Sequence, residues 1–245
     1  GVTSRPRSRP ERMSQLDPFA KPEFPSLKDK VSPEEWQARI DLAACYRLVA
    51  YHGWSRGTGN HISARVPGEP DHFLLSPHGL LFKEVTASSL VKVDFDGKKV
   101  TQTPYRINHA APRIHGAIYR ARKDLVAAIH THTETGMAIS MLKDGLMMLS
   151  LSSAMFHKRI GYHDFQGPGD TMDDCVEMSR KLGQNYALIM HNHGLITVGR
   201  TVGEAFSCMF HLELAIAAQL RAMATGRELI IPPKELADEA QQIGR

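Results

Sequence analysis

A short apolar run that ends in two histidines constrains this chain more than any other feature. Residues 125–129 read Leu-Val-Ala-Ala-Ile and lead directly into His130-Thr131-His132. In a β-strand, side chains two positions apart share one face, so His130 and His132 would lie side by side. Two imidazoles at the end of a buried strand form a chelating pair for a divalent metal.

The same pattern recurs later in the chain. Residues 186–190 read Tyr-Ala-Leu-Ile-Met and lead into His191-Asn192-His193-Gly194. A third histidine from this second apolar strand would complete a metal site with a coordination position left for a substrate. On spacing alone, both His191 and His193 can supply it.

The overall composition is that of one ordinary globular domain. The chain has 245 residues, of which 42% are hydrophobic and 23% charged, enough for one sizeable core. The first 30 residues carry seven Lys and Arg against four acidic residues, and so supply most of the formal charge of +4. The remaining body is nearly neutral, which argues against a nucleic-acid partner.

The spacing of the cysteines and the length of the apolar runs indicate the cellular compartment. Cys45, Cys175 and Cys208 are far apart and odd in number, so no disulfide framework is expected. No apolar run reaches the roughly 18–20 residues of a membrane helix, and no signal-peptide segment is visible. We therefore expect a cytoplasmic protein that does not contact a membrane.

Local signals divide the chain into an arm, a main domain and a tail. Residues 1–30 are rich in Arg, Ser and Pro, and we expect an extended, partly disordered arm. Ser32 and Pro33 predict a helix start, and Gly53 its end. The predicted buried stripe of this helix is Trp36, Ile40, Ala43, Ala44, Leu48 and Tyr51. Residues 31–226 form the predicted domain, and residues 227–245 a tail with a short helix.

Strand-like and helix-like segments alternate through the domain. Strands are expected at 62–66, 73–80, 91–98, 125–132, 146–151, 159–165, 186–190 and 194–199. Helices are expected at 112–121, 133–141, 171–182 and 201–225. Several strands can pair as hairpins, which predicts an α/β fold with a mixed, mostly antiparallel sheet covered by helices. The Gly57–Gly59 loop is either a tight turn or a close approach of backbone to a ligand.

Five motifs in this order resemble the class II aldolase/adducin family over about residues 33–226. They are Gly59-Asn60-His61-Ile62-Ser63, Ser76-Pro77-His78-Gly79-Leu80, Ile118-Tyr119-Arg120-Ala121-Arg122, His130-Thr131-His132-Thr133, and Asn192-His193-Gly194-Leu195 with Gly199. Segments 81–94, 107–111 and 161–167 resemble its adducin-like branch in particular.

The resemblance implies a three-layer α/β/α subunit, usually in a homotetramer. It also implies one divalent metal per subunit, held by His130, His132 and His193. Zn²⁺ is expected, with Mn²⁺, Fe²⁺ or Co²⁺ as alternatives. In the fuculose phosphate aldolases and ribulose phosphate epimerases of this family the metal polarises a substrate carbonyl. Gly59, Asn60 and Gly79 are the expected substrate-binding positions.

One departure from the family pattern concerns the reaction itself. Its sugar-phosphate enzymes carry a carboxylate nineteen residues before the first metal histidine, and this chain has Ala111 there. Alanine cannot move a proton, so another group must serve as the acid or base. The candidates are His109, His115, Glu134, His163 and His191. His109 is our predicted catalytic residue because it lies closest in sequence to the missing carboxylate. We expect His115 to pack or hydrogen-bond beside the apolar stripe of its helix, and Glu134 to be a surface acid at a helix start.

We therefore expect a metal-dependent lyase, of the aldolase or decarboxylase type. Its substrate would be a small hydroxy- or keto-carbonyl compound, and its protein partners further copies of the chain. The alternative is a non-catalytic adducin-like module that binds the actin cytoskeleton, which Ala111 favours and the complete set of three histidines opposes. A sugar-phosphate epimerase with a relocated base is the third interpretation.

Overall fold

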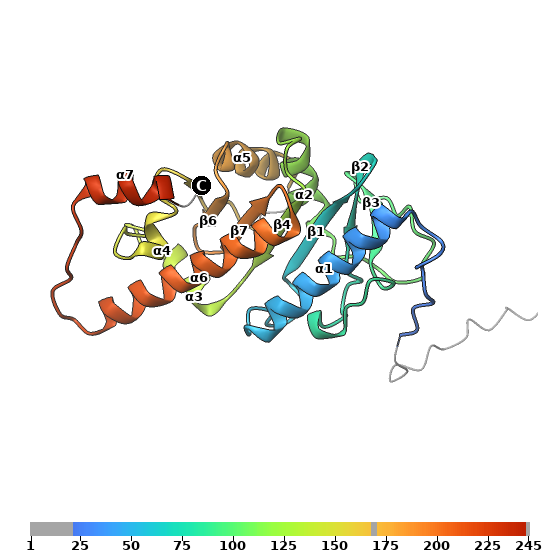
Figure 1. Cartoon of the computed structure of the whole chain (residues 1–245), viewed down its shortest axis with the longest axis horizontal. Helices are drawn as coiled ribbons and strands as arrows, with labels where there is room; N and C mark the ends of the chain where they lie inside the picture. Colours follow the sequence, from blue (N-terminus) through green and yellow to red (C-terminus); the bar gives the residue numbers. More distant parts are fainter. Residues whose placement is uncertain (1–21, 168–170, 244–245) are drawn as a thin grey trace, which may run out of the picture.

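One mixed sheet of seven strands runs through the part of the chain that the structure, a computed structural model, describes: residues 22–167 and 171–243 (Figure 1). The strands are β1 (His61–Val66), β2 (Glu69–Leu75), β3 (Val91–Asp94), β4 (Ala127–Thr131), β5 (Ile160–His163), β6 (Ala187–Met190) and β7 (Gly194–Gly199). Their order is β3-β2-β1-β4-β7-β6-β5, and every neighbouring pair is antiparallel except β5 and β6. The predicted mixed, mostly antiparallel sheet is confirmed.

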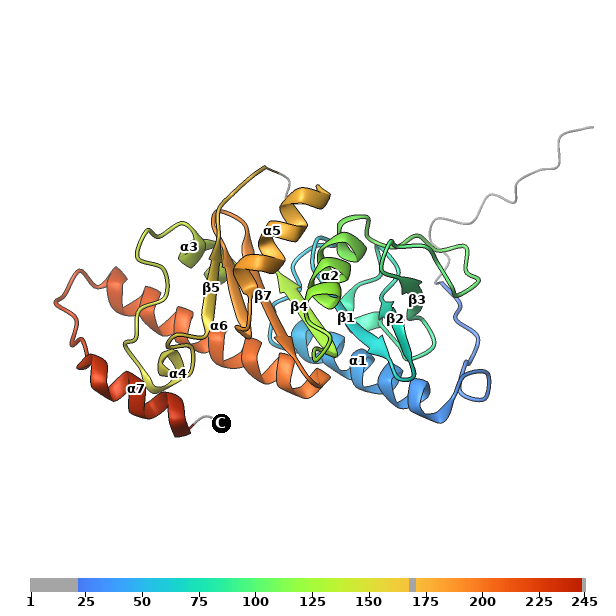
Figure 2. The same ribbon diagram turned by 90° about the horizontal axis from the view of Figure 1, so that it is seen from above.

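Helices cover both faces of this sheet. They are α1 (Pro33–Tyr51), the short 3₁₀ turn η1 (Phe82–Glu84), α2 (Ala110–Ala121), α3 (Glu134–Ser140), α4 (Leu151–Ala154), α5 (Met172–Leu182), α6 (Val202–Ala224) and α7 (Lys234–Ile243). The long helices α1 and α6 lie along one face, and α2 and α5 lie over the other (Figure 2). This is the expected three-layer α/β/α arrangement.

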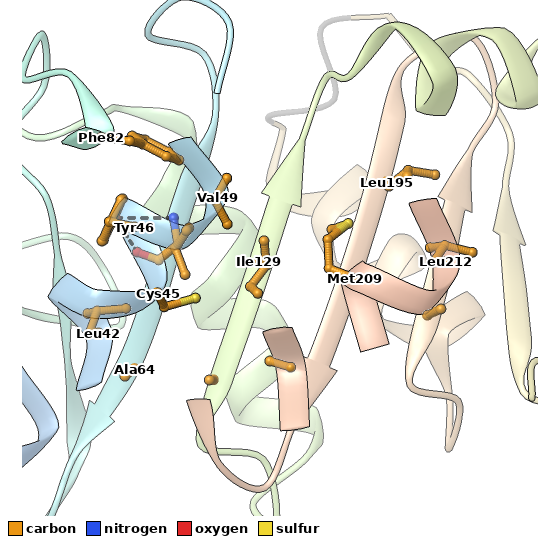
Figure 3. Close-up of a cluster of buried hydrophobic side chains, with 14 of the residues drawn as sticks. Leu42, Cys45, Tyr46, Val49, Ala64, Phe82, Ile129, Leu195, Met209 and Leu212 are labelled. Carbon is orange, nitrogen blue, oxygen red and sulfur yellow. Dashed lines mark hydrogen bonds between the residues drawn. The ribbon is translucent and has the colours of Figure 1, made fainter. Parts of the chain in front are cut away.

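Strand parity divides the apolar side chains between two cores. On the α1 and α6 side, Ile129 of β4 and Leu195 of β7 pack against Met209 and Leu212 (Figure 3). On the α2 and α5 side, Ala128 and Ile196 belong to the second core. Consecutive residues of a strand thus enter opposite cores, which is why the central strands are apolar throughout.

Helix α1 begins as predicted but buries a different face. Ser32 accepts a hydrogen bond from the Glu35 backbone N–H and Pro33 is the first helical residue. The buried residues are Glu35, Arg39, Leu42, Ala43, Cys45, Tyr46 and Val49. Ala43 is the one residue of the predicted stripe among them, because α1 is apolar on more than one side. The buried Arg39 forms an ion pair of 2.9 Å with Glu35. Ile40, Leu48 and Tyr51 remain exposed in this chain.

Two further predictions of elements were wrong. The strand expected at 146–151 is irregular chain that leads into α4. Helix α2 begins at Ala110, two residues before Pro112, because the Asn108 side chain accepts hydrogen bonds from the N–H groups of Ala110 and Ala111. Most of the predicted N-terminal arm, residues 1–21, lies outside the described residues. None of the described helices has the length and apolar character to cross a membrane.

Candidate metal centre

Two strand ends and one tight turn bring three histidines together. His130 belongs to β4 and His132 follows it directly, so parity places both on the face that carries α2 and α5. His193 lies in the three-residue turn between β6 and β7. In that turn Asn192 has a φ of +56°, a left-handed conformation that asparagine tolerates better than most residues. The turn reverses the chain so that His193 lies beside the end of β4.

The Nε2 atoms of the three imidazoles converge. Nε2 of His132 lies 3.0 Å from Nε2 of His130 and 2.9 Å from Nε2 of His193. Nδ1 of His130 donates a hydrogen bond of 2.9 Å to the Leu195 carbonyl, which leaves the lone pair of this ring on Nε2. Within residues 22–167 and 171–243, these histidines form the one cluster with ligand atoms close enough to share a metal ion.

Burial keeps the three imidazoles neutral at pH 7. It lowers the pKa of His132 to about 4, and nearby His193 adds to the effect. The pKa of His130 is well below its usual value, because the ring is buried and lies near other histidines. Burial also lowers the pKa of His193. Neutral imidazoles are the form that binds a divalent cation, so this donor set fits a metal with three nitrogen ligands and an open position.

Asn60 connects the loop before β1 to the end of β4. Its side-chain oxygen accepts a hydrogen bond of 2.7 Å from the His132 backbone N–H, and its side-chain nitrogen donates to the Arg56 carbonyl. Asn60 is buried. A Cβ atom at Gly59 would lie 3.4 Å from Nδ1 of His132, so the loop backbone passes close to this ring. The Gly59-Asn60 segment therefore positions a candidate metal ligand.

A buried carboxylate supports the same strand end from helix α6. Glu213 accepts hydrogen bonds from the hydroxyl groups of Thr133 and Thr135. Thr133 in turn caps helix α3 by accepting a hydrogen bond from the Gly136 N–H. Burial raises the pKa of Glu213. Sequence reasoning missed Glu213 because it lies within the apolar pattern of α6, and its hydroxyl partners are distant in sequence.

A recess on the α2 side of the cluster contains several predicted site residues. Asn60, His61, Gly79 and Ala111 line it. The ring of His61 lies 4.8 Å from that of His130, which places this recess next to the three histidines. The position at which the family's sugar-phosphate enzymes carry a carboxylate therefore lines a recess next to the candidate site, and here it holds an alanine.

A row of four buried, hydrogen-bonded side chains leads into the second core: His61, His115, Ser63 and Tyr119. Nδ1 of His61 lies 2.7 Å from Nε2 of His115, and Nδ1 of His115 makes a hydrogen bond with the Ser63 hydroxyl. The Ser63 hydroxyl also lies 2.7 Å from the Tyr119 hydroxyl. Burial lowers the pKa of His115 to about 3, so this ring is neutral. His115 is thus buried and hydrogen-bonded, one of the two roles expected of it, whereas its partners could not be predicted from the sequence.

The other candidates for the missing acid or base lie in different surroundings. His109 is an exposed residue at the start of α2 and its side chain does not cap the helix. Glu134 is in the exposed first turn of α3, 3.5 Å from Arg56. His191 lies in the β6–β7 turn but outside the three-histidine cluster. His163, at the end of β5, is buried and bonded to Asp174.

The fold is a three-layer α/β/α domain, and it brings three neutral histidines together at one end of its sheet. These features define a class of proteins that can bind a divalent metal in an open site. Residues 40–220 match the family described as the Class II Aldolase and Adducin N-terminal domain. The chain belongs to this class II aldolase/adducin family.

Individual relatives agree with this assignment. A Caulobacter vibrioides protein, provisionally named an aldolase class 2 protein, is 45% identical over 221 residues, covering 89% of this chain and 86% of the relative. Alpha-adducin of Rattus norvegicus is 42% identical over 190 residues, covering 76% of this chain and 26% of the adducin. This chain therefore corresponds to about a quarter of that adducin.

Solved structures share the fold as well. An aldolase II superfamily protein from Pseudomonas syringae has 43% identity and a TM-score of 0.86, with 89% of each chain covered. The L-fuculose 1-phosphate aldolase from Glaciozyma antarctica PI12 has 28% identity and a TM-score of 0.77, covering 91% of this chain and 86% of the aldolase.

Proposed function

We propose that the protein is a metal-dependent lyase, of the aldolase or decarboxylase type, that acts on a small hydroxy- or keto-carbonyl compound. One observation carries this proposal: the Nε2 atoms of His130 and His193 each lie within 3.0 Å of Nε2 of His132. This convergence supports the proposal, because three neutral imidazoles together offer three nitrogen ligands to one divalent cation.

Zn²⁺ is the proposed metal, because a neutral three-histidine donor set suits zinc and leaves a position for substrate. Mn²⁺, Fe²⁺ and Co²⁺ also accept imidazole ligands. A metal bound here would act as a Lewis acid towards a carbonyl oxygen of the substrate. The protein's own contribution is to hold the three ligands: Leu195 fixes the ring of His130, and Asn60 fixes the backbone of His132.

The proton chemistry of this chain has to differ from that of its sugar-phosphate relatives, because Ala111 cannot exchange protons. Among the candidates, His109 remains our prediction from the sequence. Its exposed position at the start of α2, two residues from Ala111, is compatible with a group that moves towards a bound substrate.

An assembly function without catalysis is the alternative. The 42% identity to alpha-adducin and the methyl group at position 111 favour it. The cluster of three histidines favours the enzyme, since three histidine ligands leave a coordination position for a substrate. An epimerase with a relocated base is a third function that the same metal site would support.

We also propose that the protein is a homo-oligomer, with a tetramer as the expected form. Tyr51 is 84% exposed, and its ring contacts His52, which in turn contacts Phe210 of α6. Leu48 and Leu214 are exposed on the same two helices. Contiguous apolar side chains of this kind favour contact with another copy of the chain.

Metal analysis of the purified protein tests the function first, with His72→Ala, a half-buried residue of β2 outside the cluster, as the control for His132→Ala. We expect at least about half a divalent ion per subunit in the native protein and in the control, and little in His132→Ala. A panel of hydroxy- and keto-carbonyl compounds should then reveal turnover that His132→Ala abolishes. Undiminished turnover in His132→Ala, or a native protein free of metal, would contradict the proposal.

A further inference from the structure

A second buried imidazole lies beside the three-histidine cluster. His163 ends β5 and Asp174 lies in the first turn of α5, and the two residues are 2% and 4% exposed. Nε2 of His163 is 2.8 Å from Oδ1 of Asp174. Because an ionised carboxylate only accepts hydrogen bonds, Nε2 of His163 carries the hydrogen and donates it to Asp174.

Among the described residues, the other nitrogen of this ring has no hydrogen-bond partner. Nδ1 of His163 is buried and has no hydrogen-bond partner within the described part of the chain. When the ring carries one hydrogen, on Nε2, its Nδ1 is an acceptor with a free lone pair. Buried acceptors without a donor are uncommon and lower the stability of a folded protein, so this nitrogen indicates a donor that the described residues do not supply.

The position of His163 shows where such a donor would come from. His163, Asp174, Met190, His191 and His193 line one small recess, which we call the His163 recess. His193 is also a member of the three-histidine cluster. The recess therefore adjoins the candidate metal site on its α5 side.

We propose that the His163 recess is a hydroxyl subsite of the candidate active site. Nδ1 of His163 accepts a hydrogen bond from a hydroxyl group of the ligand, and Asp174 is the positioning residue that selects this tautomer. The ligand class is a small carbonyl compound with at least one hydroxyl beyond the group that faces the histidine cluster. This inference deepens the proposed function, on which it rests for the placement of the ligand's carbonyl group.

The other candidate residues lack this arrangement. Both ring nitrogens of His115 are already engaged, one with His61 and one with Ser63. Glu134 is exposed and lies near a cation. His163 alone among these three combines an orienting carboxylate with an unengaged acceptor.

In the proposed lyase reaction the same contact would also provide a proton acceptor for the substrate hydroxyl, a step separate from the role predicted for His109. The O–H bond of the substrate hydroxyl breaks, the proton moves to Nδ1 of His163, and the bonding electron pair stays on the oxygen. Asp174 stabilises the positive charge that the ring then carries. In the opposite direction the imidazolium returns the proton.

Calorimetric titration of the full-length, Zn²⁺-loaded protein tests the subsite without needing turnover. The probes are dihydroxyacetone and hydroxyacetone, which share one hydroxy-ketone group and differ by one hydroxyl. We expect dihydroxyacetone to bind about fivefold more tightly, the effect of one hydrogen bond. His163→Phe should remove this preference, His163→Asn should retain part of it through its amide oxygen, and His72→Phe should leave it unchanged.

The outcomes of this titration test the hydroxyl subsite separately from the lyase activity. Equal affinity of the native protein for both probes, no binding of either probe, or an unchanged preference in His163→Phe overturns the subsite. If His163→Phe does not fold, the preference of His163→Asn for dihydroxyacetone is compared with that of the native protein instead. Full retention of metal in His163→Asn shows that the three-histidine cluster is intact. A preserved preference together with no turnover on any compound overturns the lyase proposal and supports the subsite.

Discussion

The side-chain oxygen of Asn60 accepts a hydrogen bond of 2.7 Å from the backbone N–H of His132. The bond joins two segments that are far apart in sequence, the loop before β1 and the end of β4. The backbone of a candidate metal ligand is therefore fixed by an amide side chain that need not contact the metal. Such supporting contacts contribute to metal affinity because they hold the ligand in its binding orientation.

Replacing Asn60 should weaken metal binding without removing any ligand. For Asn60→Ala we expect an affinity for Zn²⁺ about tenfold to a hundredfold lower, measured by competition with a chromophoric chelator. Asn185→Ala is the matched control, because Asn185 lies at the opposite end of β6, before Ala187. An unchanged affinity in Asn60→Ala would show that the loop does not support the site.

Gly194 should not tolerate a side chain. A Cβ atom there would collide with the carbonyl oxygen of Thr131 and lie 3.3 Å from Cδ2 of His132. Because backbone cannot yield as a flexible side chain does, Gly194→Ala should lower the free energy of unfolding by about 1–3 kcal/mol and displace His132. Urea denaturation and metal content would report the two effects.

Gly203 is the matched control for this substitution. It lies in α6, where a Cβ atom would meet only the Thr201 hydroxyl oxygen at 3.8 Å. Gly203→Ala should raise the free energy of unfolding by about 0.5–1 kcal/mol through helix propensity. Equal effects at positions 194 and 203 would contradict the proposed close approach of Gly194 to β4.

Acid should destabilise the metal-free protein through His115. Burial lowers the pKa of His115 to about 3 in the folded state, whereas the unfolded chain titrates near 6.5. Between these values the unfolded state binds more protons, so the free energy of unfolding falls as the pH is lowered from 6.5 towards 3. Urea denaturation at pH 7 and pH 5 should show this loss, and His115→Gln should reduce it.

Glu213 should stabilise the turn after His132 through its two threonine hydroxyl groups. In Glu213→Ala these buried hydroxyls lose their acceptor, so we expect the free energy of unfolding to fall by about 1–3 kcal/mol. Glu213→Gln keeps an acceptor oxygen and should lose much less. Similar losses in the two variants, measured by thermal or urea denaturation, would mean that packing rather than hydrogen bonding accounts for the contribution of this residue.

Several features of the molecule could be predicted because they depend on local periodicity. The period of two along a strand placed His130 and His132 on one face, and the capping residues Ser32, Thr171 and Thr201 marked helix starts that the structure retains. The resemblance to the family selected His193, and the structure places His193, not His191, beside the other two histidines.

The buried face of α1 could not be predicted, because more than one face of this helix is apolar. Its choice depends on what the helix packs against: Tyr46 reaches Ile62 of β1, whereas Tyr51 remains exposed in the single chain. The helix pattern alone contains no information about that neighbour. A helix that is apolar on one stripe only would have been assigned correctly.

The sequence by itself determined the family, the alternation of strands and helices, and the histidine pair on β4, since each is carried by neighbouring residues. Only the tertiary structure decided which side chains meet across elements: Asn60 with His132, His61 with His115, and His163 with Asp174. Such pairs leave no periodic signal, because a hydrogen bond between distant segments depends on sheet order and helix placement. The same folding places Ala111 in a recess next to the candidate site and, among the described residues, leaves Nδ1 of His163 without a partner.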